Sequence, residues 1–102
     1  METASGMRMV ASDQQVSCEV DGETVILHTE RGLYFNLDPV GSRVWSLLQN
    51  PVGIDAIVDT LLAEYDVGEA ICRDDVHSLL GRLLSEGLIR SCDAPVESPA
   101  SA

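Results

Sequence analysis

The stretch from residue 32 to residue 48 changes its hydrophobic period once, and this change constrains the fold more than any other feature. Leu33, Phe35 and Leu37 occupy alternate positions, which is the two-residue repeat of a β-strand. Beyond these residues the apolar positions adopt helical spacing. The helical positions are Val40, Val44, Trp45, Leu47 and Leu48.

The junction between the two patterns carries the signals of a helix start. Asp38 is suited to cap the helix with a side-chain oxygen. Pro39 suits the first helical position, because the N–H that proline lacks would be unpaired there. A strand over 33–37 is therefore expected to run directly into a helix over 39–49, and the two elements must pack together.

The segments on either side predict two more strands before this corner and two more helices after it. Alternation predicts strands over 16–20 and 23–29, joined by an Asp-Gly pair that is a strong hairpin signal. Apolar stripes predict helices over 54–65 and 69–86. The expected fold class is α+β, a winged-helix-like domain with a three-stranded antiparallel sheet followed by three helices.

Length and composition set the expected domain boundaries. The chain has 102 residues, 45% of them hydrophobic, which suffices for one domain with a modest core. Small and polar residues without a period predict a flexible N-terminal arm over 1–15. Ser, Pro, Ala and acidic residues predict a disordered acidic tail over 91–102, which leaves 16–90 as the domain. The core is expected to include Trp45, Leu47, Leu48, Leu61 and Leu62.

The charge of the chain argues against several classes of partner. The net charge is −11, from 17 acidic residues against six scattered arginines. Nucleic acids require a clustered basic face, so no nucleic-acid partner is expected. No apolar run approaches the roughly 18 residues of a membrane span, and no signal peptide is evident, so no membrane partner is expected. Three widely spaced cysteines without a CxxC pair favour reduced thiols in a cytoplasmic protein.

The residues that could carry chemistry do not form a recognisable constellation. Cys72 and His77 lie five apart on a predicted helix, which rotates them about 140° from each other and prevents a shared metal. Gly81 and Gly87 are isolated, so no phosphate-binding loop is present. We therefore expect no catalytic residues, no metal and no cofactor, and a protein that is not an enzyme.

The predicted third strand offers a binding surface instead. It lies at an edge of the meander, where half of its backbone donors and acceptors are unpaired. It carries neither lysine nor proline to discourage pairing, so an extended peptide can add there as a fourth strand. The third predicted helix is suited to form the other wall, because one margin of its apolar stripe mixes apolar and charged side chains. These are Asp75, Leu79, Arg82 and Glu86.

The same residues resemble the PqqD-like family. The pattern over residues 30–48, ERGLYFNLDPVGSRVWSLL, carries most of the resemblance, and three later segments add to it. They are LLAEYDV at 61–67, CRDDV at 72–76 and LLSEGLI at 83–89. The resemblance covers the expected domain, residues 16–90.

This resemblance implies a non-catalytic recognition element for ribosomally made, later modified peptides (a RiPP recognition element), which binds the leader segment of a precursor peptide. The chain is most similar to stand-alone versions in lasso-peptide pathways. That likeness implies delivery of the precursor to a leader-removing cysteine protease and to a macrocyclase. The alternatives are a PqqD-type chaperone that presents a precursor to a radical-SAM enzyme, a winged-helix DNA-binding protein, and a structural subunit that dimerises through the same edge.

Carried onto this chain, the resemblance implies where the peptide binds. The leader would pair with the strand over 33–37, its apolar anchors would lie against the helix over 69–86, and polar contacts would lie at the rim. The implied peptide-binding residues are Leu33, Tyr34, Phe35, Asn36, Leu37, Asp75, Val76, Leu79, Leu80, Arg82 and Leu83.

Overall fold

The computed structural model describes residues 8–92. Its elements are β1 (Arg8–Ala11), β2 (Gln15–Val20), β3 (Glu23–His28), β4 (Leu33–Leu37), α2 (Pro39–Leu47), β5 (Val52–Gly53), α3 (Ile54–Glu64), α4 (Glu69–Ser85) and β6 (Ile89–Ser91). The predicted α+β fold is confirmed, because β2, β3, β4 and the three helices each lie within two residues of their expected bounds. In the described part of the chain, no helix is long and apolar enough to span a membrane.

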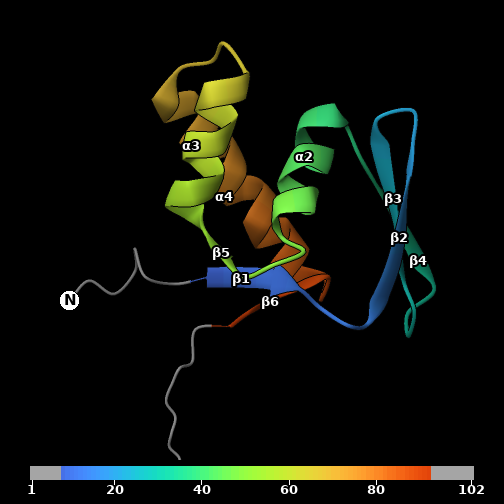
Figure 1. The fold of residues 1–102 in the computed structure, drawn as a ribbon. Coiled ribbons are helices and arrows are strands. Elements are labelled where there is room, and N and C mark those ends of the chain that lie inside the picture. Colours follow the sequence, from blue (N-terminus) through green and yellow to red (C-terminus); the bar gives the residue numbers. More distant parts are fainter. Residues whose placement is uncertain (1–7, 93–102) are drawn as a thin grey trace, which may run out of the picture.

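The main sheet has the strand order β2-β3-β4, with both pairs antiparallel (Figure 1). The turn between β2 and β3 places Asp21 at φ 55° and Gly22 at φ 83°, which is the positive-φ pair of a tight hairpin turn. β4 forms the edge of this sheet, as predicted, and among the described residues it pairs with β3 alone. Its other row of backbone donors and acceptors is therefore open.

The corner between β4 and α2 has the capping that the sequence predicts. Asp38 is the N-cap of α2, and its Oδ1 accepts a hydrogen bond from the Gly41 backbone N at 2.7 Å. Pro39 is the first residue of the helix. These contacts fix the direction in which α2 leaves the strand, and α2 then packs against the inner face of the main sheet (Figure 1).

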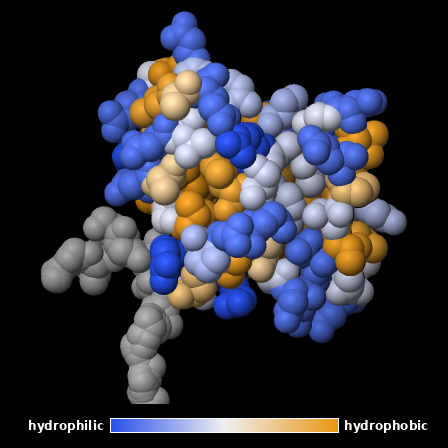
Figure 2. Space-filling model, in the orientation of Figure 1, coloured by the Kyte–Doolittle hydropathy of each residue, from blue (hydrophilic) through white to orange (hydrophobic). Residues whose placement is uncertain are grey.

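Other described elements pack on one face of the main sheet only. On the inner face Thr24, Ile26 and His28 are buried. No described element covers the outer face, and Figure 2 shows hydrophobic residues at the right of the molecule, where Figure 1 draws this sheet. The cross-strand register assigns to the outer face the apolar residues Val16, Cys18, Val20, Val25, Leu27 and Tyr34.

A second, small sheet with the order β5-β1-β6 was not expected. Its central strand is β1, so the prediction of a flexible arm over 1–15 is wrong for residues 8–11, and β2 already begins at Gln15. Ser91 likewise lies in β6 rather than in a disordered tail. Residues 1–7 and 93–102, where the rest of the expected arm and tail falls, lie outside the described residues.

The core lies between the main sheet and the helices and continues onto the small sheet. The core residues are Ile26, Leu37, Val44, Trp45, Leu48, Ile57, Val58, Leu61, Cys72, Val76, Leu80, Leu83, Leu88 and Ile89. Three of the five expected core residues, Trp45, Leu48 and Leu61, are buried. The other two, Leu47 and Leu62, are half-buried and pack against this core.

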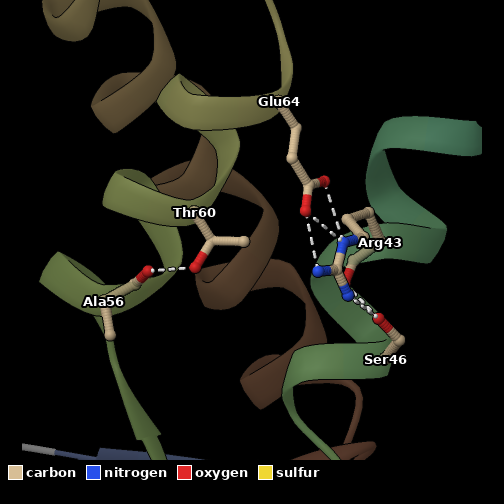
Figure 3. Close-up of polar contacts among 5 residues, drawn as sticks. All are labelled: Arg43, Ser46, Ala56, Thr60 and Glu64. Carbon is tan, nitrogen blue, oxygen red and sulfur yellow. Dashed lines mark hydrogen bonds and ion pairs between the residues drawn. The ribbon is translucent and has the colours of Figure 1, made fainter.

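An ion pair at the surface joins α2 to α3 (Figure 3). Arg43 donates from Nε and Nη2 to the Glu64 carboxylate at 2.9 and 2.8 Å, and from Nη1 to Ser46 Oγ at 3.0 Å. These hydrogen bonds lower the pKa of Glu64 and raise the pKa of Arg43. Because both side chains are exposed, the pair adds little stability, although its two-pronged geometry links α2 to α3.

Candidate functional site

A groove of about 650 Å³ runs between α4 and the junction of β4 with α2. The strand and α2 contribute Asn36, Leu37, Asp38, Val40, Gly41 and Val44. The facing wall on α4 consists of Ile71, Cys72, Asp75, Val76, Ser78, Leu79 and Arg82. α3 and the segment after it contribute Leu61, Tyr65 and Val67. The groove is therefore mainly apolar, with three charged side chains, Asp38, Asp75 and Arg82, in its lining, and its strand side belongs to the open edge strand β4.

The structure brings six of the eleven predicted site residues together in this groove. They are Asn36, Leu37, Asp75, Val76, Leu79 and Arg82. Leu33 and Phe35 face the inner side of the sheet and do not line the groove, while Tyr34 is 70% exposed on the outer face. These three residues can contact a strand added to β4 in two ways only. Their backbone groups can hydrogen-bond to it, or their side chains can pack against the cross-strand neighbours on it.

Leu80 and Leu83 are core residues rather than groove residues. They do not line the groove, and they are only 5% and 2% exposed. The groove side of α4 carries Ile71, Asp75 and Arg82, each one position before a buried residue of the helix. One residue turns an α-helix by about 100°, so these exposed residues lie beside the buried stripe of α4, whose residues Cys72 and Val76 also line the groove.

Ten of the sixteen groove residues are absent from the predicted set: Asp38, Val40, Gly41, Val44, Leu61, Tyr65, Val67, Ile71, Cys72 and Ser78. Ile71 is the informative case, because it is an apolar side chain beside the buried stripe of α4 and is 67% exposed. An apolar residue just off a helix's buried stripe is the signal that points to such a wall. Tyr65 and Val67 lie at and beyond the end of α3, where no period exists to place them.

The possible metal ligands and the thiols are dispersed over the described residues. Within residues 8–92, no three His, Cys, Asp or Glu side chains lie close enough to hold a metal ion. The cysteines are free thiols, with Cys18 exposed, Cys92 half-buried and Cys72 buried. What the arrangement provides is an unpaired strand edge next to an apolar groove. This combination is suited to an extended peptide, whose backbone pairs with the edge while alternate side chains enter the groove.

Comparison with known proteins identifies the family. The family described as coenzyme PQQ synthesis protein D (PqqD) matches residues 23–89, which include β3, β4 and all three helices. The chain therefore belongs to the PqqD family. The resemblance seen in the sequence is confirmed, and the matched range contains the whole groove.

Two solved structures are similar to this PqqD-family chain. TbiB1 in complex with the TbiA(beta) leader peptide is 41% identical, with a TM-score of 0.75, over 79% of this chain and 94% of TbiB1. A lasso peptide synthetase B1 complexed with the leader peptide is 18% identical, with a TM-score of 0.72, over 80% of this chain and 96% of that one. At 18% identity the second likeness shows the fold alone. A comparison with curated proteins gave no match.

Proposed function

We propose that this protein binds the leader segment of a ribosomally synthesised precursor peptide. The leader adds as a strand to the open edge of β4, and its inward side chains enter the groove beside α4. The observation that carries this proposal is the combination of that edge and groove with 41% identity to TbiB1, a protein solved with a leader peptide bound. Its role is recognition rather than catalysis.

Of the possible pathways, lasso-peptide biosynthesis is favoured over the pairing with a radical-SAM enzyme. TbiB1, at 41% identity, was determined with a leader peptide, and the segments LLAEYDV at 61–67 and CRDDV at 72–76 are most similar to stand-alone members of the family in lasso-peptide pathways. DNA binding is disfavoured on physical grounds, because a chain with a net charge of −11 is repelled by the phosphate backbone. A cytoplasmic location stays a prediction from the cysteine content.

A titration tests the proposal directly. The probe is the TbiA(beta) leader peptide with a fluorescent label, and the readout is its anisotropy as the protein is added. We expect saturable binding, and no binding of a scrambled peptide with the same composition. If neither this leader nor the leader of a precursor encoded beside the protein binds, the proposed function is wrong.

We further propose that the leader-removing cysteine protease docks on the outer face of the main sheet. This face exposes Val16, Val20 and Tyr34 by 56%, 53% and 70%, and it borders the β4 edge at which the leader adds. An uncovered apolar patch of this kind is typical of a protein interface. A protease docked there lies next to the bound leader, so recognition and cleavage take place on one assembly. A macrocyclase would then receive the peptide without its leader.

The test is a Val16→Glu, Val20→Glu double variant. We expect it to bind the labelled leader with an affinity within about twofold of the wild type, because both residues lie on β2, two strands from the β4 edge. We also expect it to lose co-purification with a cysteine protease encoded beside it, because a buried carboxylate without a partner is costly. Unchanged co-purification would exclude the outer face as the docking surface.

A further inference from the structure

The groove has a direction, because β4 and α4 run antiparallel along its two sides. Arg31, just before β4, donates from Nη1 to Glu86 Oε1 at 3.0 Å and to the Glu86 carbonyl at 3.2 Å. Glu86 is the C-cap of α4, so the start of the strand lies beside the end of the helix. The far end of β4 and earlier turns of α4 line the same groove, through Asn36 and Leu37 on the strand and Asp75 on the helix.

Two opposite charges lie along the α4 wall in this direction. Asp75 and Arg82 both line the groove and are exposed, and neither forms an ion pair with another residue in 8–92. They are seven residues apart, which is about 10.5 Å along a helix axis. Arg82 lies toward the end that carries Arg31, and Asp75 toward the end that carries Asp38. The groove thus has an acidic end and a basic end.

The neighbouring charged groups at each end are already engaged. At the basic end, the Arg31 guanidinium is held by Glu86. At the acidic end, the Asp38 carboxylate accepts the hydrogen bond that caps α2, and it adds to the negative potential around Asp75. Asp75 and Arg82 are therefore the two charged groove residues with which a bound ligand can form ion pairs.

From this arrangement we infer that the leader is read by the order of its charges, a step that rests on the proposed function. The main sheet is antiparallel throughout, so a strand that continues its pattern runs from the Asp38 end toward the Leu33 end. A basic side chain of the leader then pairs with Asp75, and an acidic side chain closer to its C-terminus pairs with Arg82. The recognised class is an extended peptide with a basic residue before an acidic one.

The spacing between these two leader residues follows from the geometry of the two elements. A strand rises about 3.4 Å per residue, so about 10.5 Å corresponds to roughly three residues. Side chains that point into the groove occupy alternate positions, which leaves spacings of two or four. A leader with the acidic residue first would place that residue beside Asp75 and its basic residue beside Arg82. Both contacts would then be repulsive.

The experiment uses peptides of about twelve residues built on the TbiA(beta) leader, each with one lysine and one glutamate placed in either order at every spacing from one to six. For the wild type we expect lysine-first peptides at spacings of two and four to bind about three- to tenfold more tightly than their reversed counterparts. About 0.5 M NaCl should reduce this preference. An Asp75→Lys, Arg82→Glu double variant should prefer the glutamate-first peptides.

A matched control moves the same charges away from the groove. The Asp74→Lys, Arg90→Glu double variant changes two exposed side chains that do not line the groove, and it should keep the wild-type preference. If the parent leader binds but the groove double variant keeps the lysine-first preference, or if the wild type has none, the charge-order inference is wrong while the proposed function stands. If neither the parent leader nor any charge-bearing peptide binds, both fail.

Discussion

Replacing Leu79 with aspartate is expected to raise the Kd for the labelled leader about tenfold or more, which corresponds to about 1.4 kcal/mol or more of binding free energy. Leu79 lines the groove from α4 and is half-buried in the free protein. A leader side chain in the groove would cover the part of the Leu79 side chain that is exposed in the free protein. Aspartate at this position loses the apolar contact and must give up water when the peptide binds. Anisotropy titration measures the change.

Two further variants separate a binding effect from a folding effect. Leu84→Asp introduces the same charge on the same helix, at a side chain that is 39% exposed and lies outside the groove. We expect this control to bind the leader within about twofold of the wild type. Ile71→Asp changes a groove residue that is 67% exposed, so it tests the groove with little cost to the fold. Wild-type affinity in both groove variants, with far-UV circular dichroism unchanged, would show that the leader binds elsewhere.

The sequence was most informative where neighbouring residues determine the structure. The cap at Asp38, the proline that opens α2 and the Asp-Gly turn all act within a few residues, and each appears in the structure as expected. The helices follow from stripes that span several turns. The open edge of β4 follows from three short strands joined by tight turns, because the last strand of a meander pairs on one side only.

The sequence was least informative where distant segments determine the structure. β1 has four residues and no alternating pattern, and it is a strand because Met9 pairs with Val52 on one side and with Ser91 on the other. Those partners lie more than 40 residues away, and local propensity cannot supply such pairing. Composition alone therefore predicts a flexible arm where the structure has a strand.

The groove itself was predictable in outline but not in detail. A helical wheel places Val76, Leu79, Leu80 and Leu83 in one broad apolar stripe. How that stripe divides between core and groove depends on the rotation of α4 against α3, a property of packing. The packing buries Leu80 and Leu83 and turns Ile71 outward, which a single sequence does not reveal.

The second large effect concerns the leader's backbone rather than its side chains. In an antiparallel pair, the N–H groups of one strand point toward the partner strand at alternate residues. An added strand on β4 has a partner on one side only, so every second amide of the leader donates a hydrogen bond to β4. Replacing the hydrogen of such an amide with a methyl group removes the donor and also places a carbon against the β4 carbonyl.

We therefore expect a scan of singly N-methylated leader peptides to produce a loss of affinity that alternates along the chain. Methylation at an inward amide should raise the Kd about tenfold or more, and methylation of the amides between them should have less than about a threefold effect. Because β4 has five residues, about two or three amides should be sensitive. A leader that bound as a helix would lose affinity at most interior positions, because each interior amide of a helix donates within the chain. A loss of affinity at every second methylated amide is therefore specific to strand addition. If the losses do not alternate, the leader does not pair with the open edge of β4, even if the groove variants weaken binding.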